Sequence, residues 1–280
     1  MGGRLIAADS AAGALYSLGP AGVRRAPLPG AAALCAHGAA LYCASKREDV
    51  IWRLDARTLC PQALFAGGPN VTRLIASPGG ETLYALCQDG DSVLALCART
   101  GAPQMLARAG QQPRGMALDP TGRLLAVAGG GRCEALVLDA RTLRLVRRVP
   151  LPGPAADVAF GGGMLYALHQ AGETAGRVVA LRARGGMAWS APVPGLPGGL
   201  CAVPGGVLAG AEGVSCLTRG GALWRAPMEG LCERVLAAQG RVLLSEALQG
   251  GVYALTPPRG GCEQLLPAQA DDLLWYTDAP

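Results

Sequence analysis

The hexapeptide Leu54-Asp-Ala-Arg-Thr-Leu59 recurs along the chain and decides the fold. Clear copies are Leu96-Cys-Ala-Arg-Thr-Gly101, Leu138-Asp-Ala-Arg-Thr-Leu143 and Leu181-Arg-Ala-Arg-Gly-Gly186, and weaker ones begin at Leu18, Leu217 and Leu255. Successive leucines are 36, 42, 42, 43, 36 and 38 residues apart, so seven units account for the 280-residue chain. A period of about 40–45 residues is typical of the four-stranded blades of a β-propeller.

Each unit contains four short runs separated by turn residues. In one unit they are Gly115–Leu118, Leu124–Ala128, Ala135–Leu138 and Leu145–Val149, which we call strands A to D. Runs of this length, bounded by Gly, Pro, Asp or Thr, are typical of strands, and no segment between turns could hold the helices of an α/β fold. The sequence therefore predicts an all-β, seven-bladed propeller of four-stranded antiparallel blades that forms a single domain over residues 1–280.

The polarity of the runs predicts where each strand lies in its blade. The inner runs are continuously apolar, as expected where both faces of a sheet are buried between neighbouring sheets. The D runs carry arginines that suit a solvated edge strand, namely Arg24, Arg25, Arg147 and Arg148. Strand D is therefore expected to be outermost.

The two ends of the chain complement each other. Gly3–Ala8 resembles a B strand with no A strand before it, and Asp271–Tyr276 resembles an A strand with nothing after it. We therefore predict that a C-terminal strand over about 271–276 pairs with the N-terminal strand and completes the first blade, which removes two open sheet edges.

The stretches Val93–Ala128 and Ala135–Leu168 resemble the YVTN repeats of the YncE-like seven-bladed propellers. The resemblance rests on a V-x-x-L-D-x-x-T turn, a P-x-G-x-A-x-x-P-x-G segment and an L-Y-A strand. The asparagine that names the repeat is absent, and Gln88, Ala128 and His169 stand near its place. The resemblance implies a propeller that binds something, because members of this family differ in role.

Composition excludes several classes of protein. Half of the residues are hydrophobic and the net charge is +5, which excludes a disordered chain. The longest uncharged stretch, residues 185–211, holds too many Gly and Pro residues for a membrane-spanning helix, and the N-terminus has no signal peptide pattern. We expect a cytoplasmic, monomeric protein that binds neither membrane nor nucleic acid, since its arginines form no basic run. Its ten cysteines are then expected to be reduced, mostly core thiols, rather than disulfides.

In a propeller the B–C and D–A loops gather at one mouth of the central channel, and we expect ligand binding there. The candidate ligand-binding residues in these loops and at the starts of A strands are Thr72, Arg114, Asp157, His169, Arg234, Asp271 and Asp272. Arg114 is the foremost candidate, since an arginine fixed at a channel mouth could clamp a carboxylate or phosphate. The alternative is that it pairs with Asp157, Asp271 or Asp272 and only satisfies the channel rim.

Little in the sequence supports catalysis, a metal or a cofactor. His37 and His169 fall at opposite ends of their blades, so no histidine pair forms. His169 could act as a base beside a carboxylate, but a solvated loop residue is the simpler interpretation. Gln88-Asp-Gly-Asp-Ser92 lacks the further ligands of a calcium loop, and the tryptophan motif of quinone-dependent dehydrogenases is absent. No catalytic residue, metal or cofactor is therefore assigned.

The leading functional hypothesis is a non-catalytic binding or scaffolding propeller. It presents the channel mouth formed by the B–C and D–A loops to a protein partner or a small anionic ligand. The alternative is a lactonase-like hydrolase that uses Arg114, His169 and a carboxylate at the same mouth.

Overall fold

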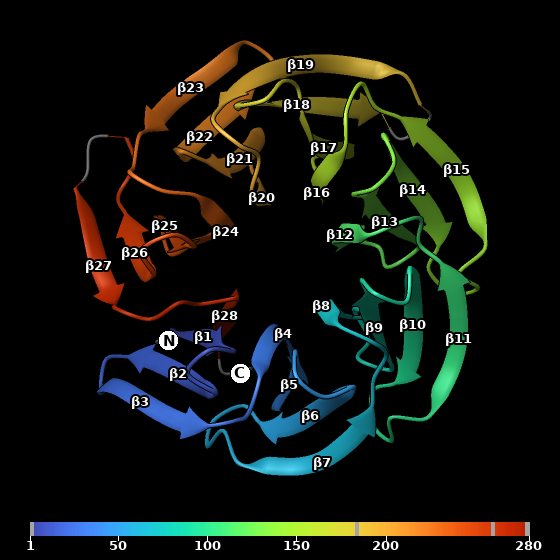
Figure 1. The fold of residues 1–280 in the computed structure, drawn as a ribbon, viewed down its shortest axis with the longest axis vertical. Coiled ribbons are helices and arrows are strands. Elements are labelled where there is room, and N and C mark those ends of the chain that lie inside the picture. The colour runs from blue at the N-terminus through green and yellow to red at the C-terminus, as the bar shows by residue number, and fades with distance from the viewer. Residues whose placement is uncertain (1–2, 183–184, 259–260, 278–280) are drawn as a thin grey trace. The chain divides into compact units, whose positions relative to one another are not determined.

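A computed structural model of the chain describes residues 3–182, 185–258 and 261–277. In this part of the chain 28 strands form seven four-stranded antiparallel sheets arranged as a β-propeller, with no helix, which confirms the predicted fold class (Figure 1). No helix long and apolar enough to cross a membrane occurs among the residues described.

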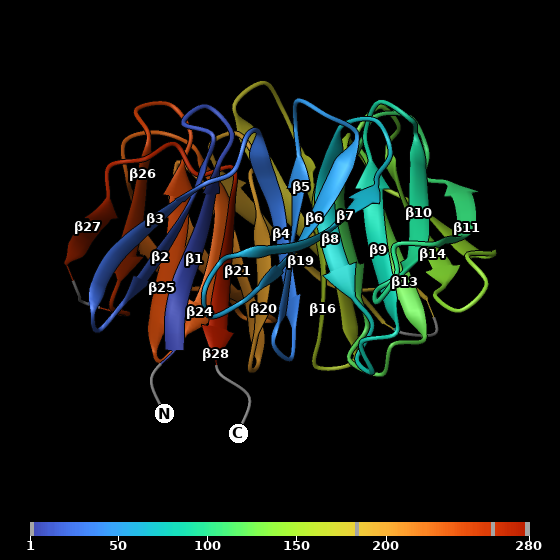
Figure 2. The ribbon, with the colours of Figure 1, turned by 90° about the horizontal axis from the view of Figure 1, so that it is seen from below.

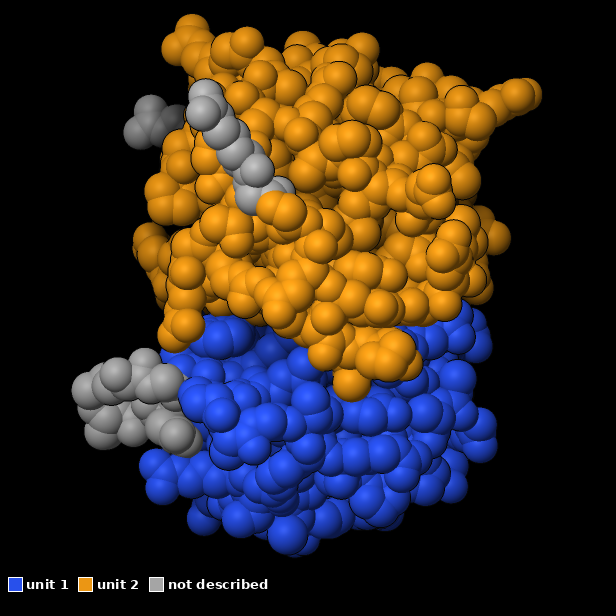
Figure 3. Space-filling model, turned by 90° about the vertical axis from the view of Figure 1, so that its left-hand side faces the viewer, with its two compact units in different colours: residues 1–109, 268–280 blue, residues 110–267 orange. Residues whose placement is uncertain are grey.

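The chain divides into two compact units (Figure 3). Unit 1 comprises residues 1–109 and 268–280, and unit 2 comprises residues 110–267. The single domain expected from the sequence stays a prediction.

Unit 1 holds three blades. Blade 1 is β28 (Asp272–Thr277), β1 (Gly3–Asp9), β2 (Ala14–Gly19) and β3 (Gly22–Pro27). Blade 2 is β4 (Ala31–His37), β5 (Ala40–Ser45), β6 (Val50–Asp55) and β7 (Pro61–Ala66). Blade 3 is β8 (Val71–Ala76), β9 (Thr82–Cys87), β10 (Ser92–Cys97) and β11 (Pro103–Arg108).

Unit 2 holds four blades. Blade 4 is β12 (Pro113–Leu118), β13 (Leu124–Gly129), β14 (Glu134–Asp139) and β15 (Leu145–Pro150). Blade 5 is β16 (Ala155–Gly161), β17 (Met164–Gln170), β18 (Ala175–Arg182) and β19 (Met187–Pro194). Blade 6 is β20 (Leu200–Val203), β21 (Gly206–Ala211), β22 (Gly213–Thr218) and β23 (Gly221–Ala226), and blade 7 is β24 (Cys232–Ala238), β25 (Arg241–Glu246), β26 (Gly251–Leu255) and β27 (Cys262–Leu266).

The recurring hexapeptide forms the turn between strands C and D. Asp55 accepts hydrogen bonds from the backbone N–H and the hydroxyl of Thr58 (2.8 and 2.9 Å), and Asp139 does the same with Thr142. The next residue adopts the left-handed region, with φ of 60° at Leu59, and the matching position in blade 3 is a glycine. The Asp and Thr side chains thus hold the turns of blades 2 and 4 closed, which explains why the hexapeptide is most alike in these two blades.

The second strand of each blade is buried on both faces, as the apolar runs predicted. All six residues of β5 and of β21 are buried, and every residue of β13 after the first is buried. Alanine is frequent among the buried residues between blades 4, 5 and 6 of unit 2, for example Ala126, Ala128, Ala167 and Ala180. Small side chains let adjacent sheets approach closely while still removing apolar surface from water.

The predicted closure of the first blade is confirmed. β28 pairs antiparallel with β1 from Gly3↔Thr277 to Ala8↔Asp272, and the two strands lie side by side (Figure 2). The outer strands also behave as expected, because Arg24, Arg25 and Arg148 are exposed on β3 and β15. The described cysteines are all free thiols, and five of the ten are buried.

Candidate functional site

β-Bulges lie at the starts of several A strands, directly after the D–A loops, and they change the direction of the side chains of predicted site residues. The pairing of strands A and B shifts register between Val71 and Arg73 in blade 3 and between Pro113 and Gly115 in blade 4. The extra residues at these shifts are Thr72 and Arg114, so two predicted site residues occupy equivalent bulge positions. A bulge leaves its extra residue out of the ladder and re-aims its side chain.

The residue after the bulge in blades 3, 5 and 7, together with the residue at the matching position in blade 1, forms a second equivalent set. Asp157 pairs with Leu168 in blade 5, Arg234 with Ser245 in blade 7, and Asp272 with Ala8 in blade 1. Arg73, which pairs with Leu86 in blade 3, belongs to the same set and was missed from the sequence. Aligning Val71-Thr-Arg-Leu74 with Cys232-Glu-Arg-Val235 would have found it, because both segments follow a D–A loop.

The two aspartates of this set tie neighbouring blades together within each unit. Asp272 accepts hydrogen bonds from the N–H of Leu34 in the next blade (2.8 Å) and of Leu273 (3.0 Å). Asp157 likewise accepts from Leu200 N–H in the next blade (2.8 Å) and from Val158 N–H (2.9 Å). Both carboxylates are buried, with 8% and 6% of the residue exposed, so each one satisfies buried backbone donors at a blade boundary.

Burial dominates the titration of Asp272. Desolvation raises its pKa to about 6, and the positive charge of Arg73 and the hydrogen bonds from Leu34 and Leu273 oppose that rise only in part. The positive charge of Arg73 therefore favours the ionised form of Asp272, although burial remains the larger effect on its pKa.

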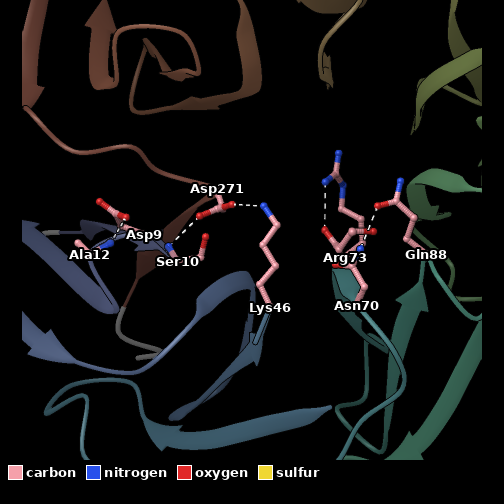
Figure 4. A network of polar contacts seen from close by, with 9 residues as sticks. Asp9, Ser10, Ala12, Lys46, Asn70, Arg73, Gln88 and Asp271 are labelled. Carbon is pink, nitrogen blue, oxygen red and sulfur yellow. Dashed lines mark hydrogen bonds and ion pairs between the residues drawn. The ribbon is translucent and has the colours of Figure 1, made fainter. Parts of the chain in front are cut away.

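The loops of unit 1 carry a polar network around Asp271 (Figure 4). Lys46 Nζ lies 2.6 Å from Asp271 Oδ1, and the N–H of Ser10 donates to Asp271 Oδ2 at 2.8 Å. On the blade 3 side of Figure 4, Arg73 donates to the carbonyl oxygen of Thr72 at 3.1 Å, and Asn70 Nδ2 donates to Gln88 Oε1 at 3.3 Å. The predicted residue Asp271 thus contacts Lys46 and the backbone of Ser10, and the predicted residue Thr72 contacts Arg73 in a separate group.

In unit 2 the foremost candidate, Arg114, is exposed, and its stem lies over Gly130. Its expected role as an anion clamp, and the alternative of a pair with Asp157, both stay predictions. Arg234 donates to the carbonyl oxygen of Glu233 at 3.3 Å. Asp271 and Asp272 belong to the other unit, and their approach to Arg114 stays a prediction.

His169 differs most from its expected environment. It lies in strand β17 rather than in a solvated loop, only 1% exposed, because it occupies the B-strand position opposite the bulge of β16. Its Nδ1 is 2.8 Å from the carbonyl oxygen of Gln170, and its Nε2 is buried with no hydrogen-bond partner in the part of the chain described. It borders an open pocket of about 560 Å³ that Arg177 and the turn at Pro152–Pro154 also line.

The B-strand position of His169 organises the B–C loop in other blades. Glu246 accepts hydrogen bonds from the N–H groups of Leu248, Gln249 and Gly250, and Asp9 accepts from the N–H of Ala12 (2.7 Å). Ser45 accepts from the N–H groups of its own loop at 3.2 Å. Asp9, Ser45 and Glu246 therefore hold the B–C loops of their blades in shape.

Charge separates between the two ends of the blades. In the described B–C and D–A loops of unit 2, one basic residue (Arg132) faces three acidic ones (Glu173, Glu212 and Glu229). In the described A–B and C–D turns of the same unit, four basic residues (Arg123, Arg141, Arg144 and Arg219) face one acidic residue (Asp119). In unit 1 the B–C and D–A loops hold two basic residues (Lys46 and Arg47) and five acidic ones (Glu48, Asp49, Asp89, Asp91 and Asp271).

Two grooves lie at the basic A–B/C–D end of unit 2, which sequence reasoning did not single out. The first, about 500 Å³, lies between blades 4 and 5 and is floored by Val137, Phe160 and Leu165. The second, about 280 Å³, lies between blades 5 and 6 over Tyr166 and Trp189, whose ring centroids are 5.8 Å apart. In the residues described, no group of three or more His, Cys, Asp or Glu side chains could hold a metal ion.

Comparison with known proteins supports the fold. Hydrazine synthase from Kuenenia stuttgartiensis is similar at 17% identity and a TM-score of 0.74 over 82% of this chain and 78% of that one. The Pan2 WD40 domain from Neurospora crassa matches at 15% identity and TM-score 0.64 (81% of this chain, 75% of that one). The dihydro-heme d1 dehydrogenase NirN, solved in complex with DHE, matches at 15% identity and a TM-score of 0.65, over 97% of this chain and 74% of that one. No protein-family model and no curated protein matches, so the YncE-like family stays a prediction.

Proposed function

We propose that this chain is a non-catalytic binding module that presents one end of its blades to a partner protein. The observation that carries the proposal is how acidic residues at the expected mouth are used. The predicted residues Asp157 and Asp272, and Glu246 at the position that matches His169, all direct their carboxylates at backbone N–H groups. Groups held in this way position strands and loops, whereas a hydrolytic site needs a base and an oxyanion donor directed at one void.

Charge favours a protein partner over a small anion at the B–C/D–A end. In unit 2 that end carries three acidic residues against one basic residue in its described loops, which repels an anion approaching Arg114 or Arg234. The neighbouring structures include two enzymes and a WD40 domain, so the fold by itself is compatible with catalysis and with binding.

Photo-crosslinking in cells tests this proposal. A benzophenone amino acid replaces exposed Glu212 in a B–C loop in one variant and exposed Arg141 in a C–D turn in another. A discrete adduct with one protein from one end, and none from the other, supports a binding module. No adduct from either position, together with turnover of a lactone or ester panel, would overturn it.

One observation favours the hydrolase as a second candidate. His169 Nδ1 lies 2.8 Å from a carbonyl oxygen, so in the neutral ring the proton is on Nδ1 and Nε2 carries the lone pair. The residue also borders the 560 Å³ pocket. A base of this kind predicts that His169→Gln abolishes any lactone hydrolysis while Arg132→Gln, in another loop of unit 2, preserves it. Equal turnover by both variants rules His169 out as the base.

A further inference from the structure

We infer that the A–B/C–D end of unit 2 binds an extended acidic peptide segment of a partner protein through two apolar side chains. This inference rests on the proposed binding function and assigns it a surface opposite to the expected mouth. The surface comprises the groove between blades 4 and 5 (groove 1) and the groove between blades 5 and 6 (groove 2).

The two grooves are adjacent and offer separate apolar sites. Met164 lines both of them, because it begins the inner strand β17 of blade 5, which the grooves flank. The floor of groove 1 is aliphatic and aromatic, with Val146 58% exposed at its edge. Trp189 and Tyr166 form the wall of groove 2. Two hollows that share one edge suit two apolar side chains on one extended backbone.

Arginines border both grooves. Arg147 lines groove 1 and reaches towards the turn of blade 5, where its Nη1 lies 2.9 Å from the position of a Cβ added to Gly185. Arg182 and Arg219, both exposed, line groove 2 from blades 5 and 6. Guanidinium groups at the borders of an apolar groove are suited to carboxylates, which they can bind through two parallel hydrogen bonds.

The acidic residue at this surface is already engaged. Asp119 of groove 1 accepts hydrogen bonds from the N–H groups of Arg123 and Leu124, each at 2.6 Å, and from the hydroxyl of Thr121. These bonds close the A–B turn of blade 4. The four basic residues in the turns of this end therefore exceed its acidic charge, and the charge complementarity indicates an acidic occupant.

Fluorescence anisotropy with a defined probe tests the inference. The probe is a fluorescein-labelled peptide, Asp-Glu-Leu-Asp-Phe-Glu-Asp, titrated with the full chain. We expect the double variant Arg182→Glu/Arg219→Glu to bind about 10-fold more weakly and Val146→Asp about 5-fold more weakly. Arg132→Glu, the same charge change in a B–C loop of unit 2, should leave the affinity within about 2-fold. Unchanged melting temperatures show that the variants are folded.

Matched probes separate the contributions and the competing ligands. The amide version of the peptide (Asn and Gln for Asp and Glu) and the version with Ser for Leu and Phe should each bind at least about 10-fold more weakly. A ten-residue oligothymidylate or phosphatidylserine vesicles that displace the probe at lower concentration than the unlabelled peptide would overturn the inference.

The outcomes also separate this inference from the proposed function. If the peptide binds but Arg132→Glu weakens it as much as the Arg182/Arg219 reversal, this surface is wrong while a binding function stands. If the position of Glu212 crosslinks a partner and that of Arg141 does not, the partner occupies the other end and the inference fails alone.

Discussion

The replacement Asp272→Asn tests whether a buried carboxylate ties β28 to blade 2. Burial raises the pKa of Asp272 from 3.8 to about 6. A shift of about two units corresponds to roughly 3 kcal/mol. Between pH 4 and pH 6 the folded chain therefore holds a proton that the unfolded chain has lost. By linkage, this group's contribution to the free energy of unfolding falls by up to roughly 3 kcal/mol as pH rises from 4 to 7.

Asparagine has no such titration, and it offers one acceptor oxygen to the two N–H groups of Leu34 and Leu273. Leaving one buried donor unsatisfied costs about 1–3 kcal/mol. We therefore expect the variant to be less stable than the wild type at pH 4 and to equal or exceed it at pH 7.

Urea unfolding followed by tryptophan fluorescence at pH 4, 5, 6 and 7 gives the unfolding midpoints of the wild type and of Asp272→Asn. Other titrating groups contribute equally to both proteins, so they cancel in the difference between the two midpoints. The matched control is Asp55→Asn. The backbone and side-chain hydrogen bonds from Thr58 lower the pKa of Asp55, so its contribution is lost only as pH falls below its ordinary value. A difference for Asp272→Asn that stays constant from pH 4 to 7 would refute the reasoning.

Three further outcomes are expected. Cys97 replaces the turn aspartate, and hydrogen bonds from Thr100 lower the pKa of its thiol. In the native protein Cys97 should therefore react with iodoacetamide faster than the buried cysteines, as measured by mass spectrometry of samples taken over time. Cys97→Asp should raise the melting temperature, whereas Cys97→Ser should not. Gly198→Ala should destabilise by about 2 kcal/mol or more, since a Cβ there would lie 2.0 Å from a carbonyl oxygen of the next blade, whereas Gly172→Ala, with no atom closer than 3.9 Å, should be near neutral in thermal melting. Deleting residues 271–280 removes β28 from blade 1 and should abolish cooperative unfolding by circular dichroism, and a cooperative transition at the wild-type temperature would contradict the closure.

The two ends of the blades of unit 2, either of which could bind a partner under the proposed function, differ in charge and in apolar character. The expected mouth is acidic in its loops, and its buried carboxylates serve the fold. The opposite end of unit 2 combines apolar grooves with arginines, a pattern that favours recognition of an acidic chain segment. Either end can be blocked by substitution of exposed residues, which makes the two hypotheses separable.

The sequence by itself determined the number of blades, their four strands and the pairing of the two chain ends. These features depend on local chemistry. Asp55 with Thr58 and Asp139 with Thr142 bond within four residues, and apolar runs mark strands buried on both faces. The turn segment and the apolar runs recur in each of the seven units, so their regular spacing identifies the repeat even where a single copy is weak.

Only the tertiary structure decided what the candidate side chains do. A one-residue bulge placed Thr72 and Arg114 outside the ladder, and the strand register buried His169, although all three precede or follow a loop in sequence. The partners of Asp157 and Asp272 lie 43 and 238 residues away along the chain. Contacts of this kind depend on how neighbouring sheets pack, and a repeat pattern holds no information on side-chain direction at a bulge.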